Sequence, residues 1–151
     1  MTCRQTVPTQ WLILDARMGD NWRKTIRRLP RGNGVLVLCK LSVKELRSLR
    51  HLARLRQLSI VEERSRKAAR VHNVQELREA LQKRTPLLFI SPIFKTESHS
   101  DWLPLPRMRA AALARLAKRK VIALGGMNCD RFNRVQRLGF IGWAGISAFK
   151  T

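Results

Sequence analysis

The chain has few cysteines, and their positions exclude two common kinds of stabilised fold. Cys3, Cys39 and Cys129 are widely separated, odd in number and include no CxxC pair. Neither a disulfide framework nor a zinc site is indicated, which favours a reducing cytoplasm. The sequence also lacks an apolar run near the roughly 20 residues of a membrane span. Its N-terminus lacks the basic segment followed by an apolar segment that is typical of a signal peptide, so we expect a soluble cytoplasmic protein.

Acidic residues are scarce: 10 Asp and Glu stand against 31 Lys and Arg, for a net charge of +21. Such a surface attracts polyanions, so a basic nucleic-acid-binding protein is one hypothesis. The sequence contains no helix-turn-helix, zinc-finger or aromatic single-strand motif, so nucleic acid would be bound only nonspecifically, through phosphates. A solvated coat of arginines explains the charge equally well.

Short apolar runs alternate with helical patterns along the 151 residues. Runs buried on both sides and separated by helices indicate βαβ units, so we expect an α/β fold with a parallel sheet. The length predicts a single domain, 1–151, and falls below the roughly 250 residues of an eight-stranded β/α barrel. The expected strands are residues 11–14, 35–38, 58–61, 69–72, 87–90, 121–124 and 141–144.

Two helices have readable starts. Ser42 precedes Glu45, and Asn73 precedes Glu76, at the spacing of a capping box. Apolar residues then recur every three to four positions, and we expect these stripes to face the core. The stripes are Val43, Leu46, Leu49 and Ala53; Val74, Leu77 and Leu81; and Met108, Ala112 and Leu116.

Polar and glycine residues recur directly after the expected strands. In a parallel α/β protein the functional groups lie beyond the carboxyl ends of the strands, so we predict one composite site. At Gly125 and Gly126 the absence of side chains lets backbone N–H groups approach an anion. The residues at strand ends are Asp15, Arg17, Cys39, Lys40, His72, Asn73, Thr96, Ser98, His99, Gly125, Gly126, Gly145, Ile146 and Ser147.

The segments 71–73, 91–99, 121–127 and 142–149 resemble the thiamine-phosphate synthase family and its relatives, the thiazole tautomerases, in order and spacing. The resemblance implies a β/α (TIM-type) barrel. The connection 62–70 is too short for the crossover helix, strand and second helix of a full barrel. We therefore expect a barrel shortened to about seven parallel strands, incomplete or open. An exposed strand edge makes a homodimer one hypothesis.

Members of the family join a pyrimidine diphosphate to thiazole phosphate and release pyrophosphate with the help of magnesium. The resemblance therefore implies a transferase of thiamine biosynthesis that binds small phosphorylated substrates, with Mg²⁺ as cofactor. The chain lacks the family's magnesium-binding aspartate motifs, so no metal ligands are identified. By position, pyrophosphate would be held by Thr96, Ser98 and His99. Thiazole phosphate would be held by Gly125, Gly126, Ile146 and Ser147.

A second hypothesis is a tautomerase-like protein, or a catalytically inactive phosphate-binding relative. His72 matches a position at which thiazole tautomerases carry a histidine for proton transfer, and an imidazole that titrates near neutrality suits that work. Alternatively, His72 only forms a hydrogen bond at a strand end, and Gly125-Gly126 is a simple turn. Trp102 and Trp143 are predicted to be packing residues.

Overall fold

Seven parallel strands form one sheet in the order β3-β2-β1-β7-β6-β5-β4. The computed structural model describes residues 6–97, 99–118 and 120–149. Every expected strand is present, with ends shifted by at most one residue. The strands are β1 (Gln10–Leu14), β2 (Gly34–Val37), β3 (Ser59–Glu62), β4 (Ala68–Val71), β5 (Leu87–Ile90), β6 (Lys120–Leu124) and β7 (Gly142–Gly145).

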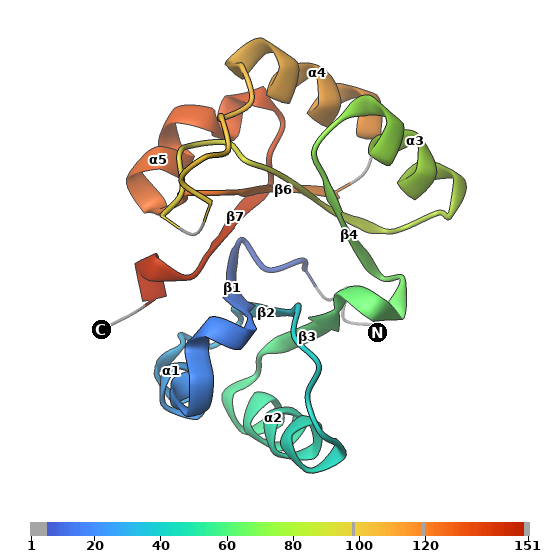
Figure 1. Ribbon diagram of the computed structural model, residues 1–151. Helices are drawn as coiled ribbons and strands as arrows, with labels where there is room; N and C mark the ends of the chain where they lie inside the picture. Colours follow the sequence, from blue (N-terminus) through green and yellow to red (C-terminus); the bar gives the residue numbers. More distant parts are fainter. Residues whose placement is uncertain (1–5, 98, 119, 150–151) are drawn as a thin grey trace.

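Helices connect the strands and cover the outside of the sheet (Figure 1). α3, α4 and α5 lie against one part of it, and α1 and α2 against the other. No helix in the described part of the chain has the length and apolar character needed to cross a bilayer. The α-helices are α1 (Trp22–Arg28), α2 (Val43–Arg56), α3 (Val74–Gln82), α4 (Arg107–Ala117) and α5 (Cys129–Val135). The 3-10 helices are η1 (Ala16–Asn21), η2 (Glu63–Ser65), η3 (Gln136–Leu138) and η4 (Ser147–Phe149).

The sheet curls into a nearly closed barrel whose interior is apolar. Inward-facing side chains from six strands pack in one cluster, among them Trp11, Phe89 and Ala144. The rings of Trp11 and Phe89 meet edge to face with centroids 5.6 Å apart. Their strands, β1 and β5, are separated by β7 and β6 in the sheet, so the contact requires curvature. The side chains that alternate with these face the helices, which explains why the strands are apolar on both sides.

The barrel is interrupted between β3 and β4, which form the two edges of the sheet. Only the five residues 63–67 separate these strands, and η2 occupies three of them. Parallel neighbours need a crossover of roughly a dozen residues, so β3 and β4 cannot pair directly. The expected shortened barrel of seven strands is therefore confirmed.

One helical stripe faces the opposite way from our prediction, and the first residues of the other two stripes, Val43 and Val74, are exposed as well. Met108 and Leu116 on α4 are 80% and 56% exposed, whereas Leu113 on the same helix is only 1% exposed. The core-facing side of α4 is instead made mostly of alanines, which let the helix approach β5 and β6 closely. Periodicity alone could not choose between the two faces, because α4 carries apolar residues on both of them. Its inward-facing residues are Ala110, Ala111, Leu113, Ala114 and Ala117.

The orientation of α4 predicts different costs for two similar substitutions. Leu113→Ala should lower the free energy of unfolding by roughly 2–5 kcal/mol, because it leaves a cavity between α4 and the sheet. Leu116→Ala, on the solvent side, should change it by less than about 0.5 kcal/mol. Urea denaturation of both variants measures the difference. Equal losses would contradict the orientation described here.

Candidate functional site

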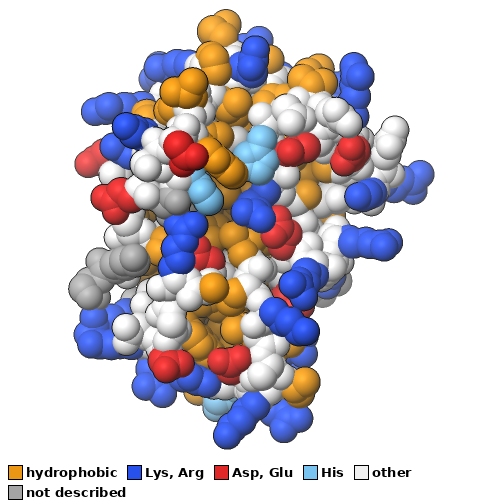
Figure 2. Space-filling view, viewed as in Figure 1, with side chains coloured by type: hydrophobic (Ala, Val, Ile, Leu, Met, Phe, Trp, Pro, Cys, Tyr) orange, Lys and Arg blue, Asp and Glu red, His pale blue; other side chains and the backbone are white. Residues whose placement is uncertain are grey.

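The carboxyl ends of the strands surround a cavity of about 500 Å³. It is lined by residues that follow β1, β4, β5, β6 and β7, which the barrel brings to one rim. Figure 2 shows histidine side chains near the middle of this face, beside basic side chains. The residues predicted from sequence that line the cavity are Asp15, His72, Thr96, His99, Gly125, Gly126, Gly145, Ile146 and Ser147.

Other residues at strand ends do not reach the cavity. Arg17, Cys39 and Lys40 are absent from its lining, and Asn73 instead caps α3. Burial raises the pKa of the Cys39 thiol above its usual value. A raised pKa lowers the thiolate fraction, so Cys39 is a poor nucleophile. Ser98 lies outside the described residues.

The Gly125-Gly126 turn forms one wall of the cavity. Both residues have positive φ angles, 104° and 59°, which residues with a side chain rarely adopt. A Cβ on Gly126 would overlap the carbonyl oxygen of Lys95, so the two loops fit only without a side chain there. Arg131 on α5 reaches back and donates from Nη1 to the carbonyl oxygen of Gly126. This contact places the Arg131 guanidinium beside Gly125 and Gly126, which together form the glycine wall of the cavity.

The end of β7 contributes the neighbouring wall. Ile146 and Ser147 lie at the start of η4, a 3-10 helix of three residues, where the N–H of Phe149 donates to the carbonyl oxygen of Ile146 at 3.1 Å. The first N–H groups of a helix have no partner within it, so those of Ser147 and Ala148, which both line the cavity, are candidate donors to a ligand. The buried Trp143 ring stacks on Phe149 and supports this turn.

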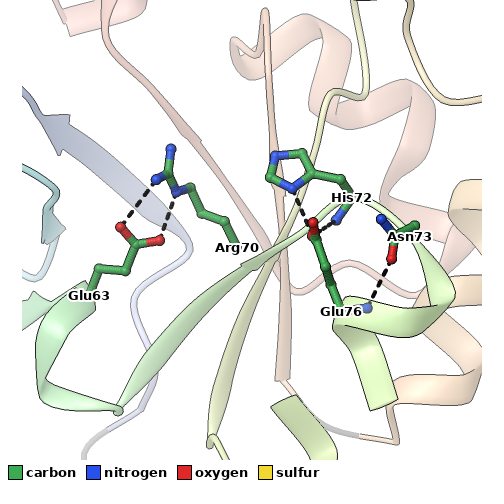
Figure 3. A network of polar contacts seen from close by, with 5 residues as sticks. All are labelled: Glu63, Arg70, His72, Asn73 and Glu76. Carbon is green, nitrogen blue, oxygen red and sulfur yellow. Dashed lines mark hydrogen bonds and ion pairs between the residues drawn. The ribbon is translucent and has the colours of Figure 1, made fainter. Parts of the chain in front are cut away.

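His72 forms a pair with Glu76 at the end of β4 (Figure 3). Its Nδ1 lies 2.8 Å from Oε2 of Glu76, and its backbone N–H donates to the same oxygen at 2.7 Å. The capping box predicted here is therefore altered: Asn73 accepts from the N–H of Glu76, but the carboxylate binds His72 instead. A carboxylate at Nδ1 favours the tautomer whose Nε2 is an acceptor. Since His72 lines the cavity, this imidazole can accept a proton from a ligand.

Trp102 lies at the mouth of the cavity rather than in the core. Its side chain is 43% exposed, in contrast to Trp143, which is buried as predicted. His99 stacks on the indole with ring centroids 4.2 Å apart, and His72 meets it edge-on at 5.6 Å. The predicted packing role of Trp102 is therefore wrong. Its ring joins the two histidines in one aromatic cluster.

Sequence reasoning missed Arg131, although a signal was present. Arg131 lies in the first turn of α5, three residues after the N-cap Asn128, where a positive charge opposes the helix dipole. A basic residue at such a position does not stabilise the helix, which suggests that its side chain has a binding role. In the structure its guanidinium lies 5.2 Å from the centroid of the Phe94 ring and lines the cavity.

The fold and the cavity together define a β/α-barrel protein with a cavity at the carboxyl rim of its strands. A model of the thiamine monophosphate synthase family matches residues 55–149, and the chain belongs to this family. Among solved structures, it is similar to the thiamine phosphate pyrophosphorylase from Pyrococcus furiosus, with 18% identity and a TM-score of 0.75. The alignment covers 95% of this chain and 88% of that one. A comparison with curated proteins gives no match.

Magnesium, which the resemblance implied, would find few side-chain ligands in this cavity. Proteins hold Mg²⁺ through one or two carboxylates together with phosphate and water. The carboxylates in the lining are Asp15, after β1, and Glu97, after β5. Asp15 is engaged by Arg17, whose backbone N–H donates to Oδ1 at 2.9 Å. Over the described residues, no three His, Cys, Asp or Glu side chains gather in a group that could hold a metal ion.

The position of Trp102 predicts which indole is open to solvent. In a fluorescence experiment, iodide should quench mainly this residue, because the Trp143 ring is buried against Phe149. Trp102→Phe should remove most of the iodide-accessible emission, and the matched Trp143→Phe variant should retain it. A larger loss in the Trp143 variant would show that the cavity mouth is arranged differently.

Proposed function

We propose that this protein binds thiazole phosphate at the carboxyl rim of the barrel and acts on it in thiamine biosynthesis, with His72 transferring a proton. The observation that carries the proposal is the single cavity shared by Gly126, Ser147 and His72. These residues lie far apart in the chain and follow three different strands. Family membership supports the substrate class, because the matching model is that of thiamine monophosphate synthase.

The phosphate group would lie between the two strand ends that offer backbone donors. Backbone N–H groups at Gly125 and Gly126, and at Ser147 and Ala148, would face its oxygens, as expected for an anion held by turns. Arg131 would add a positive charge from the side of the glycine wall. A guanidinium binds phosphate oxygens through several N–H donors at once, which fixes the orientation of the ligand.

Proton transfer would then take place at Nε2 of His72. Glu76 holds Nδ1 as the donor, so Nε2 is free to accept a proton from one carbon of the bound heterocycle and return it to another. The carboxylate would also stabilise the imidazolium that forms between the two steps. This arrangement favours tautomerase-like chemistry.

A second candidate is the transfer reaction of the synthases, in which a pyrimidine diphosphate would be bound beside thiazole phosphate. The loop after β5 supports it, because Thr96, His99 and Lys95 line the same cavity. The N–H of His99 donates to Oγ1 of Thr96 at 3.0 Å, so the hydroxyl keeps its own proton for a ligand oxygen. Pyrophosphate release from both substrates tests this candidate directly.

Arg131 provides a test of the phosphate site. Thiazole phosphate should raise the melting temperature of the protein, because a ligand that binds only the folded state stabilises it. Arg131→Gln should remove most of that shift, whereas Arg134→Gln, an exposed position on the same helix, should preserve it. Each shift is measured against the unliganded variant. An unchanged shift in Arg131→Gln would remove this residue from the site.

His72 provides a test of the chemistry. His72→Gln should lower the rate of thiazole phosphate tautomerisation by roughly a hundredfold or more, since a positioned general base typically contributes that much. The thermal shift by thiazole phosphate should persist, because the phosphate contacts remain. His51→Gln, an exposed histidine on α2, serves as the control and should keep the full rate. A normal rate in His72→Gln would assign proton transfer elsewhere.

A further inference from the structure

A bidentate ion pair spans the gap between the two edge strands at the rim of the cavity (Figure 3). Arg70 on β4 donates from Nε to Oε1 of Glu63 at 2.7 Å and from Nη2 to Oε2 at 3.2 Å. Glu63 is the first residue of η2, directly after β3. The side chains of Arg70 and Glu63 are 38% and 27% exposed, so the pair is accessible to solvent and to a ligand.

Arg70 has more hydrogen-bond donors than this ion pair engages. A guanidinium carries five N–H donors, and Glu63 accepts two of them. Figure 3 shows the third nitrogen, Nη1, pointing away from Glu63. Arg70 and His72 are two residues apart, so both project from the same face at the end of β4, and both line the cavity.

Three basic side chains line the cavity, which favours an anionic ligand. Arg70, Lys95 and Arg131 line it from β4, from the loop after β5 and from α5. The lining carboxylates, Asp15 and Glu97, are fewer than these cations. Among the described residues, no group of three or more His, Cys, Asp or Glu side chains could hold a metal ion, so side chains are the source of positive charge that the structure shows here.

We propose that Arg70 is a ligand-binding residue that takes the diphosphate of a substrate or of released pyrophosphate, in the absence of a divalent cation. This inference rests on the second candidate function, the transfer reaction, and specifies how its diphosphate-bearing ligand is held. The planar guanidinium matches phosphate oxygens and stays charged at any working pH. Glu63 holds Arg70 at the gap and competes with the ligand for the same positive charge.

Two substitutions within the ion pair should act in opposite directions. Inorganic pyrophosphate is titrated calorimetrically into the full chain, once in EDTA and once in excess magnesium. Arg70→Gln should weaken binding roughly tenfold or more, as expected for lost hydrogen bonds between charged groups. Glu63→Gln should strengthen it, because the competing carboxylate is gone. Arg64→Gln, an exposed arginine of η2 with the same change of charge, is the control and should stay within about twofold.

A purely structural role for the ion pair gives a different result. If Arg70 only holds the strand edges together, both substitutions weaken binding, and that outcome overturns the proposal. Where Arg70→Gln does not fold, Glu63→Gln still decides, because its affinity must rise. Arg70→Lys adds a graded measurement, since an ammonium keeps the charge but loses the planar fork.

Comparing the titrations in EDTA and in excess magnesium distinguishes failure of this inference from failure of the proposed function. Binding in EDTA that magnesium does not strengthen supports the proposal. Pyrophosphate binding that requires magnesium overturns it, while the thermal shift by thiazole phosphate leaves the proposed function standing. If neither thiazole phosphate nor pyrophosphate binds under either condition, both conclusions fall.

Discussion

The parallel alignment of the seven strands is the constraint on which the rest of the structure depends. Because every strand runs the same way, the carboxyl ends share one rim, and residues as distant in the chain as Asp15 and Ser147 line one cavity. Burial on both faces commits the strand side chains to apolar packing. The polar side chains of the cavity therefore lie mainly on the loops, and the rigid strands hold these loops in position.

The short connection between β3 and β4 gives this barrel its particular character. Five residues are too few for a parallel crossover, so β3 and β4 do not pair and remain the two edge strands of the sheet. Glu63 and Arg70 lie on the two sides of that gap and pair across it. The same interruption that shortens the barrel thus brings the Arg70 guanidinium into the lining of the cavity, beside His72.

Two local helix rules are broken at the cavity, and in both cases the side chain contacts a residue of the lining. Glu76 has the spacing of a capping-box glutamate, yet its carboxylate binds His72 at both the ring and the backbone. Arg131 opposes the dipole of α5, yet its side chain bonds Gly126. By contrast, Ser42 and Glu45 form a complete capping box far from the site. The capping preference of the sequence is therefore followed at α2, where the cap has only a structural role.

The strand positions, the parallel sheet and nine residues of the cavity lining followed from the sequence. Strands buried on both faces are written as continuous apolar runs, and glycines mark the turns that follow them. The face of α4 did not follow from the sequence, since Met108 and Leu113 differ little in hydrophobicity and only packing decides which is covered. The placement of Trp102, Arg70 and Arg131 around the cavity was likewise decided by the tertiary structure. Such contacts join residues far apart in the chain, and long side chains can point in several directions until their neighbours are in place.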